Sequence, residues 1–90
     1  MSKGRIDKSV ALQYDFEGAP RVVAAGQFDM AEKIISRAID ADVPIVEDPQ
    51  LAHVLSKVPL GEEIPQDLYR AVAEVLVFLL RVEIDLDQRV

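Results

Sequence analysis

The stretches SVALQYD at residues 9–15 and APRVVAAG at residues 19–26 decide how this chain begins to fold. In the first stretch, Val10, Leu12 and Tyr14 recur at the two-residue period of a half-buried strand. The second stretch is continuously apolar after Arg21, and the DFEGAP sequence between the two is rich in turn-forming residues. The two stretches are therefore predicted to pair as a β-hairpin.

A helix and a third strand are predicted to follow the hairpin. Asp29 and Glu32 resemble a capping box at the start of a helix that runs to about Asp40. The VPIV sequence at residues 43–46 is then expected to form a short strand, which would complete a right-handed parallel βαβ crossover. Asp48 and Pro49 are typical of a further helix start, and this helix should end near residue 57.

The last helix is predicted to begin at Pro65 and to carry the longest apolar stripe. Its apolar positions repeat at helical spacing: Leu68, Tyr69, Val72, Val75, Leu76 and Leu79. The expected fold is α/β, a small mixed sheet of three to four strands (hairpin plus βαβ) packed by three to four helices. Residues 1–8 are expected to be a flexible lead-in, residues 9–82 a single domain, and residues 83–90 a tail that frays.

The composition narrows the class of protein. Half of the 90 residues are apolar, which suits one small domain, and the absence of cysteine excludes disulfides and thiolate metal sites. The net charge of −6 and the scattered Lys and Arg residues argue against a nucleic-acid partner. The longest apolar tract, residues 75–80, is far shorter than a membrane span, and no secretory signal is recognised, so a cytoplasmic protein is expected.

No catalytic residue, metal site or cofactor is predicted. His53 is the only histidine and has no nucleophile near it in sequence, so a surface or packing role is favoured over catalysis or metal binding. The acidic residues are assigned either to a solvated rim (Asp40, Asp42, Glu47, Asp48) or to the electrostatically favourable start of the last helix (Glu62, Glu63, Asp67).

Four stretches together carry a family resemblance: VALQYD, APRVVA, VPIVEDP and LGEEIPQDLYRAVAEVL. Over about residues 9–78 the chain resembles the C-terminal cytoplasmic domain of the FlhB/YscU family, the export-switch proteins of flagellar and type III secretion systems. The resemblance implies that residues 9–82 form one FlhB/YscU C-terminal-like domain.

The resemblance also implies where self-cleavage would occur. Family members carry an Asn-Pro-Thr-His motif just before this region, and the Asn side chain attacks its own carbonyl. In this chain the four positions are occupied by Gly4, Arg5, Ile6 and Asp7. Glycine has no side chain to cyclise, so the chain is expected to be unable to cleave itself and to resemble a stand-alone paralogue, equivalent to the already cleaved fragment without the membrane-spanning half.

A docking site is implied in the same way. The family presents a small apolar depression that docks segments of export substrates, and the matching positions here are Ala19, Pro20, Ala73 and Leu76. Small and rigid residues suit such a concavity. The alternative interpretation is that Ala73 and Leu76 are ordinary core residues on a periodic helix.

The expected function is that of a non-enzymatic protein-binding module associated with a flagellar or type III export apparatus. Expected partners are export substrates of the rod, hook or needle type and membrane-bound export proteins, which would hold the chain at the inner membrane without insertion. The resemblance implies a further strand ahead of the motif, which this chain is expected to lack. An open sheet edge is therefore expected, which would accept a strand from the membrane-bound protein, be tolerated as an open edge, or support a homodimer. A small α/β ligand-binding domain or hydrolase unrelated to export is the alternative.

Overall fold

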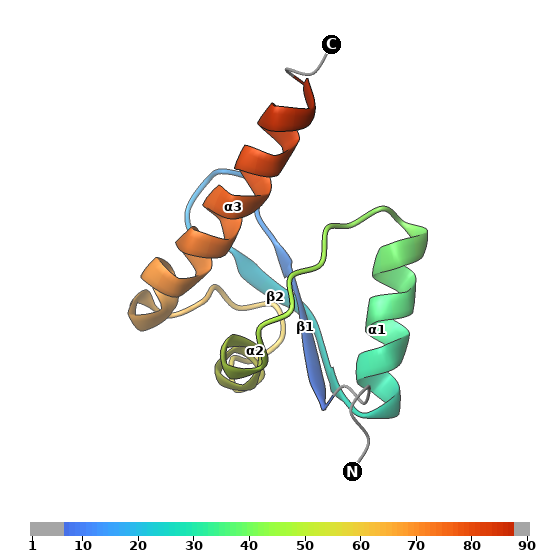
Figure 1. Cartoon of the computed structure of the whole chain (residues 1–90). Helices are drawn as coiled ribbons and strands as arrows, with labels where there is room; N and C mark the ends of the chain where they lie inside the picture. Colours follow the sequence, from blue (N-terminus) through green and yellow to red (C-terminus); the bar gives the residue numbers. More distant parts are fainter. Residues whose placement is uncertain (1–6, 88–90) are drawn as a thin grey trace.

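The computed structural model describes residues 7–87, and it describes the side chains of residues 7–79. The elements follow in the order β1 (Lys8–Gln13), β2 (Arg21–Gln27), α1 (Asp29–Asp40), α2 (Pro49–Leu55), the 3-10 helix η1 (Gln66–Leu68) and α3 (Tyr69–Asp87). Helix α1 lies on one side of the hairpin, and α2 and α3 lie on the other (Figure 1). The α/β class is confirmed as a small mixed domain.

The predicted hairpin is confirmed. Strands β1 and β2 pair antiparallel from Lys8 opposite Gln27 to Gln13 opposite Arg21, with a register shift after Ala11. Successive side chains on a strand face opposite sides, so β1 serves two layers. Its Ser9 hydroxyl donates a hydrogen bond of 2.9 Å to the Ala31 carbonyl of α1, and its neighbour Val10 packs towards the other layer.

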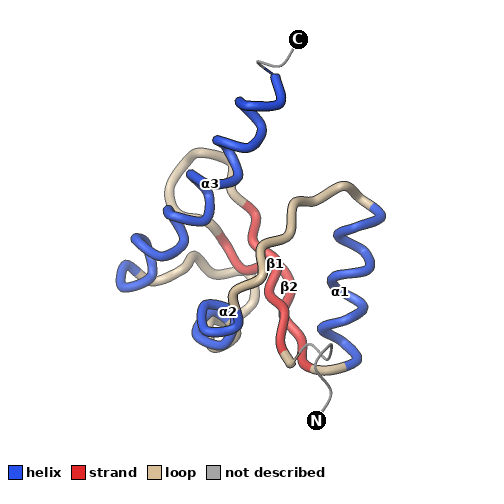
Figure 2. Tube along the Cα trace, in the orientation of Figure 1, coloured by secondary structure: helices blue, strands red, loops and turns tan. Residues whose placement is uncertain are grey.

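The predicted third strand is wrong. Residues 43–46 form no strand, every residue from 41 to 50 is exposed, and in Figure 2 this segment is drawn as loop. The Val43 N–H donates to the Ala38 carbonyl at 2.8 Å, which closes the end of α1 instead of joining a sheet. Pro44 has no N–H to offer a neighbouring strand. Within residues 7–87 the sheet therefore has two strands, not three to four, and the βαβ crossover does not form.

A different segment pairs with β2. The Ile64 N–H donates to the Pro20 carbonyl at 2.9 Å, and the Val22 N–H donates to the Glu62 carbonyl at 3.0 Å, around an isolated antiparallel bridge between Arg21 and Glu63. The Arg21 guanidinium reinforces this bridge by donating to the Gly61 carbonyl at 3.1 Å. The start of β2 is thus bonded on both of its sides.

The helix starts follow the predicted chemistry in one case and depart from it in the other. The Asp48 side chain caps α2 by accepting from the Leu51 N–H at 3.1 Å, with Pro49 in the first turn, as predicted. Helix α1 spans the predicted residues, but its N-cap is Phe28 and no side-chain cap bond forms there. The predicted capping box is therefore wrong: Asp29 and Glu32 occupy the first turn, where the helix dipole favours their charge.

The core lies between the hairpin, α2 and α3. Its buried members are Val22, Leu55, Ile64 and Val72, and eight half-buried apolar residues pack around them. Helix α3 begins after η1, which Pro65 precedes, and continues to Asp87, past the predicted domain end at residue 82. In the described part of the chain, no helix combines the length and apolarity of a membrane span.

Candidate docking site

Ala19 and Pro20 are held in place by the segment that pairs with β2. Pro20 is buried, and its carbonyl accepts the hydrogen bond from the Ile64 N–H. Ala19 is half-buried and packs against the core cluster of Val22, Leu55, Ile64 and Val72. These two residues therefore form a firmly supported corner where the hairpin turn enters β2.

The two predicted residues on α3 differ in environment. Leu76 is half-buried and packs against the same core cluster as Ala19, so both lie on the α3 side of the hairpin. Ala73 is exposed and is therefore not a core residue. The alternative interpretation, that both are ordinary core residues, is therefore wrong for Ala73, whereas Leu76 contributes to the core and is also partly open to solvent.

Ala73 lines a shallow hollow on the outside of α3. The hollow has a volume of ≈ 420 Å³ and its lining residues are Arg70, Ala73, Glu74, Val77 and Phe78. Val77 and Phe78 are 47% and 59% exposed, so two large apolar residues lie open to solvent on this part of the helix. Of the four predicted site residues, only Ala73 lines this hollow; the lining does not include Ala19, Pro20 or Leu76.

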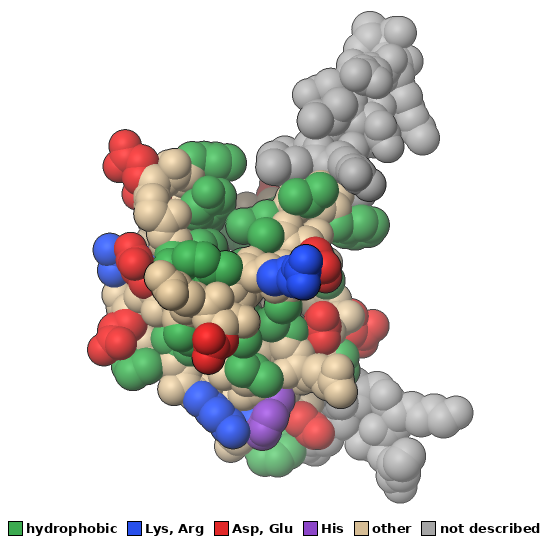
Figure 3. Space-filling view, turned by 90° about the vertical axis from the view of Figure 1, so that its left-hand side faces the viewer, with side chains coloured by type: hydrophobic (Ala, Val, Ile, Leu, Met, Phe, Trp, Pro, Cys, Tyr) green, Lys and Arg blue, Asp and Glu red, His purple; other side chains and the backbone are tan. Residues whose placement is uncertain are grey.

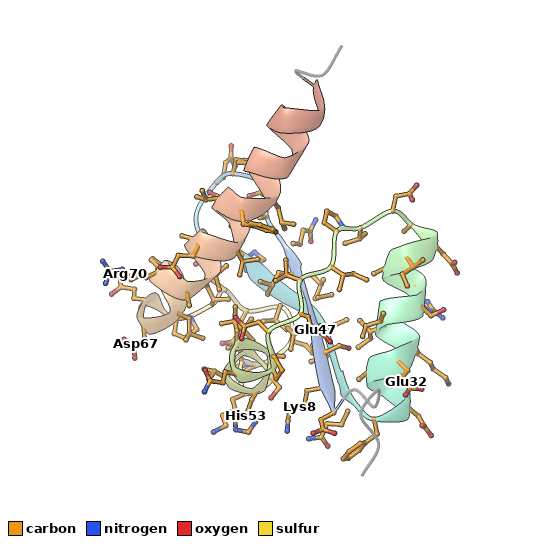
Figure 4. The ribbon with its side chains drawn as sticks, viewed as in Figure 1. Lys8, Glu32, Glu47, His53, Asp67 and Arg70 are labelled. Atoms are coloured by element: carbon orange, nitrogen blue, oxygen red, sulfur yellow. The ribbon has the colours of Figure 1, made fainter. Side chains whose placement is uncertain are left out.

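Charged and apolar side chains are mixed on this side of the molecule. Figure 3 shows hydrophobic patches separated by acidic and basic groups. The labelled Arg70 and Asp67 lie near the start of α3 and point away from the body of the molecule (Figure 4). A partner that docks on Ala73 would therefore meet an apolar surface with the Arg70 guanidinium at its edge.

Sequence reasoning missed Val77 and Phe78. The run VLVFLL at residues 75–80 is apolar at every position, so helical periodicity could not separate a core face from an exposed face. The available signal was their placement: neither residue belongs to the stripe that contains Val72 and Leu76.

The positions that match the cleavage motif lie mostly outside the described residues. Gly4, Arg5 and Ile6 fall in that part, and Asp7 is the first residue that the structure describes. Asp7 is exposed, and its carbonyl accepts a hydrogen bond of 2.8 Å from the Phe28 N–H. The hairpin ladder therefore continues one residue beyond β1.

The other polar candidates have structural roles or lie free in solvent. His53 is exposed on α2, and its carbonyl accepts from the Ser56 hydroxyl at 2.6 Å. Glu63 lies 3.5 Å from the Arg21 guanidinium. Among the residues whose side chains are described, no group of three His, Cys, Asp or Glu side chains could hold a metal ion.

Comparison with known proteins gives a consistent result. A model of the family described as FlhB HrpN YscU SpaS matches residues 6–79. The chain is 40% identical over 80 residues to the protein YlqH of Bacillus subtilis, covering 87% of this chain and 86% of that one. It is 45% identical over 74 residues to the flagellar biosynthetic protein FlhB of Escherichia coli, covering 79% of this chain and 19% of FlhB.

Solved structures show the same likeness. The cytoplasmic domain of FlhB from Shewanella putrefaciens matches with a TM-score of 0.83 and 32% identity, covering 91% of this chain and 69% of that one. The PscU C-terminal domain matches with a TM-score of 0.77 and 25% identity, covering 81% and 96%. The chain spans about a fifth of the length of the curated FlhB relatives it matches.

Proposed function

Because the chain belongs to the FlhB HrpN YscU SpaS family, we propose that it is a protein-binding module of a flagellar or type III export apparatus. In this proposal it acts in the cytoplasm like the cleaved C-terminal domain of an export switch. The observation that carries the proposal is the match to the cytoplasmic domain of FlhB over 91% of this chain with a TM-score of 0.83.

The proposed docking surface consists of Ala19, Pro20, Ala73 and Leu76. Three features support it: Ala19 and Leu76 pack against one core cluster, Pro20 is fixed by a backbone hydrogen bond, and Ala73 is exposed beside an apolar hollow. A short apolar segment of an export substrate would gain most of its binding energy by covering the exposed parts of Ala19, Ala73 and Leu76, while the buried Pro20 supports them from below. Rigid neighbours keep the ordering cost of such docking low.

The proposed activity is binding without chemistry. The step that relatives are expected to perform needs a side-chain amide, and Gly4 supplies none at the matching position. We therefore expect the purified chain to keep its mass on prolonged incubation, which intact-mass spectrometry measures. A spontaneous cut after Gly4 would contradict this part of the proposal.

The proposed partner at the sheet is a strand from the membrane-bound export protein. Strand β1 pairs with β2 along one edge, and within residues 7–87 no other strand pairs with it. An unpaired edge offers N–H and C=O groups to an added strand. Hydrogen exchange with and without the truncated export protein should show new protection in residues 8–13 alone, whereas a homodimer would protect the same residues in a concentration-dependent way.

A pull-down with purified rod, hook or needle subunits tests the docking proposal. Ala73→Asp places a charge on an exposed site and should weaken capture, because a desolvated carboxylate opposes apolar docking. Ala41→Asp makes the same chemical change at an exposed position after α1 and is the matched control. Circular dichroism establishes that both variants fold. Equal capture by the two folded variants would remove Ala73 from the site.

A further inference from the structure

A second hollow lies between α3 and the exposed segment that leads into α2. Its volume is ≈ 330 Å³, and its lining residues are Val46, Asp48, Ala71, Glu74, Val75 and Phe78. Two stretches of chain build it, because Val46 and Asp48 come from the loop and the rest from α3. The export proposal makes no use of this surface.

The second hollow occupies a different flank of α3 from the proposed docking surface. Residues advance by about 100° around a helix, so Leu76 and Phe78 point about 160° apart. Ala73 does not line the second hollow, and neither does Leu76. Phe78 and Glu74 border both hollows, which makes them a ridge between two separate surfaces.

The lining exposes apolar side chains that a partner could cover. The side chain of Phe78 is 59% exposed and that of Val46 is 38% exposed, and Val43 and Ile45 continue the exposed aliphatic run along the loop. An aromatic side chain at the edge of a hollow is a typical anchor for an incoming apolar group. The surface therefore favours a ligand with at least one large apolar side chain.

The charges of the lining have one sign. Asp48 and Glu74 are its charged members, and no Lys or Arg lines it among the described side chains. Glu47 is exposed on the same loop, where Figure 4 labels it, and the whole chain carries a net charge of −6. Such a field attracts cationic groups and repels acidic partners.

We propose that this hollow binds a protein segment in which a large apolar side chain is flanked by Lys or Arg. The apolar side chain would fill the space between Phe78 and Val46, and the flanking cations would lie against Glu74 and Asp48. Binding would be weak and salt-sensitive, because both carboxylates lie at a solvent-exposed rim.

Nuclear magnetic resonance titration of the full chain tests the proposal. The probe is a short synthetic peptide with a phenylalanine between lysines, and its counterparts carry glutamates in place of the lysines or serine in place of the phenylalanine. The peptide with phenylalanine between lysines should shift the amide signals of Val46, Ala71 and Phe78. High salt should lower its affinity. Neither counterpart should bind.

Substitutions on α3 assign the contributions. Glu74→Gln should lower the affinity for the peptide about two- to fivefold, as expected for the loss of one exposed ion pair. Phe78→Ser should lower the affinity for the peptide about tenfold or more, because this substitution removes the aromatic anchor. Val77→Ser is the matched control, since Val77 is exposed on the same helix but lines only the first hollow.

Several outcomes would overturn the proposal. Equal binding of the glutamate peptide would show that charge has no part, and shifts centred on Ala73 and Val77 would place the segment in the first hollow. Absence of shifts in the unmodified chain would show that the hollow binds no such segment. Capture of rod, hook or needle subunits is measured separately from this peptide titration, so a failed export proposal and a failed second site give different results.

Discussion

Val72→Ala should cost this domain a large part of its stability. Val72 is 1% exposed and belongs to the buried cluster with Val22, Leu55 and Ile64. Removing two buried carbon atoms forfeits about 1.6 kcal/mol of transfer free energy. The cavity left behind adds about 1 kcal/mol, and the better helix propensity of alanine returns about 0.5 kcal/mol. The expected net loss in the free energy of unfolding is about 2 kcal/mol.

This loss is readily measured. A chain of 90 residues typically has a free energy of unfolding of about 5 to 13 kcal/mol, and each kcal/mol shifts Tm by about 4 to 8 °C at this size. Val72→Ala should therefore lower Tm by about 8 to 16 °C in a thermal melt followed by circular dichroism. Urea unfolding should give the same ranking with an unchanged m value.

Val77→Ala is the matched control for Val72→Ala. It makes the same change on the same helix at a side chain that is 47% exposed, so its effect should stay within about 0.5 kcal/mol. Similar losses at the two positions would refute the assignment of α3's inner and outer faces. The proposed hollows would lose their basis at the same time.

Three further substitutions probe local interactions, each measured by urea unfolding. Asp48→Ala should lose about 1 kcal/mol with the cap of α2, whereas Asp48→Asn should be nearly neutral. Asp42→Gly should raise stability by about 0.5 to 1 kcal/mol because Asp42 has φ 59° and follows the end of α1. Ser9→Ala should lose about 0.5 to 1.5 kcal/mol because it removes the buried hydrogen bond to the Ala31 carbonyl, and a loss below about 0.3 kcal/mol would contradict that role.

Local chemistry made much of the fold predictable. The Asp48 and Pro49 pair identified the start of α2, and two-residue alternation identified β1, because caps and strand periodicity depend on neighbours in sequence. The N-cap of α1 did not follow from such a rule. Phe28 takes that position with φ 50° while its N–H bonds to the Asp7 carbonyl, a contact between distant residues that no local pattern encodes.

The sheet prediction failed for a related reason. The VPIV sequence of residues 43–46 is strand-like in composition but finds no pairing edge, whereas GEEI at residues 61–64 looks like a turn and still bonds to β2. The difference lies in burial, because Ile64 packs in the core cluster while its N–H bonds to the Pro20 carbonyl, whereas residues 43–46 are all exposed. For the candidate site, family resemblance supplied Ala73, but the apolar surface beside it required the orientation of α3.

The bridge between Arg21 and Glu63 closes a long loop that contains the middle of the chain. It joins backbone stretches about forty positions apart, and helices α1 and α2 lie wholly between them. Closing a loop costs chain entropy, but this cost grows only slowly with loop length, by about 0.6 kcal/mol for each doubling. Residues 41–47 are exposed and lie within this intervening segment. A protease that cut them would therefore leave two fragments that stay associated through the bridge at Arg21 and the common hydrophobic core.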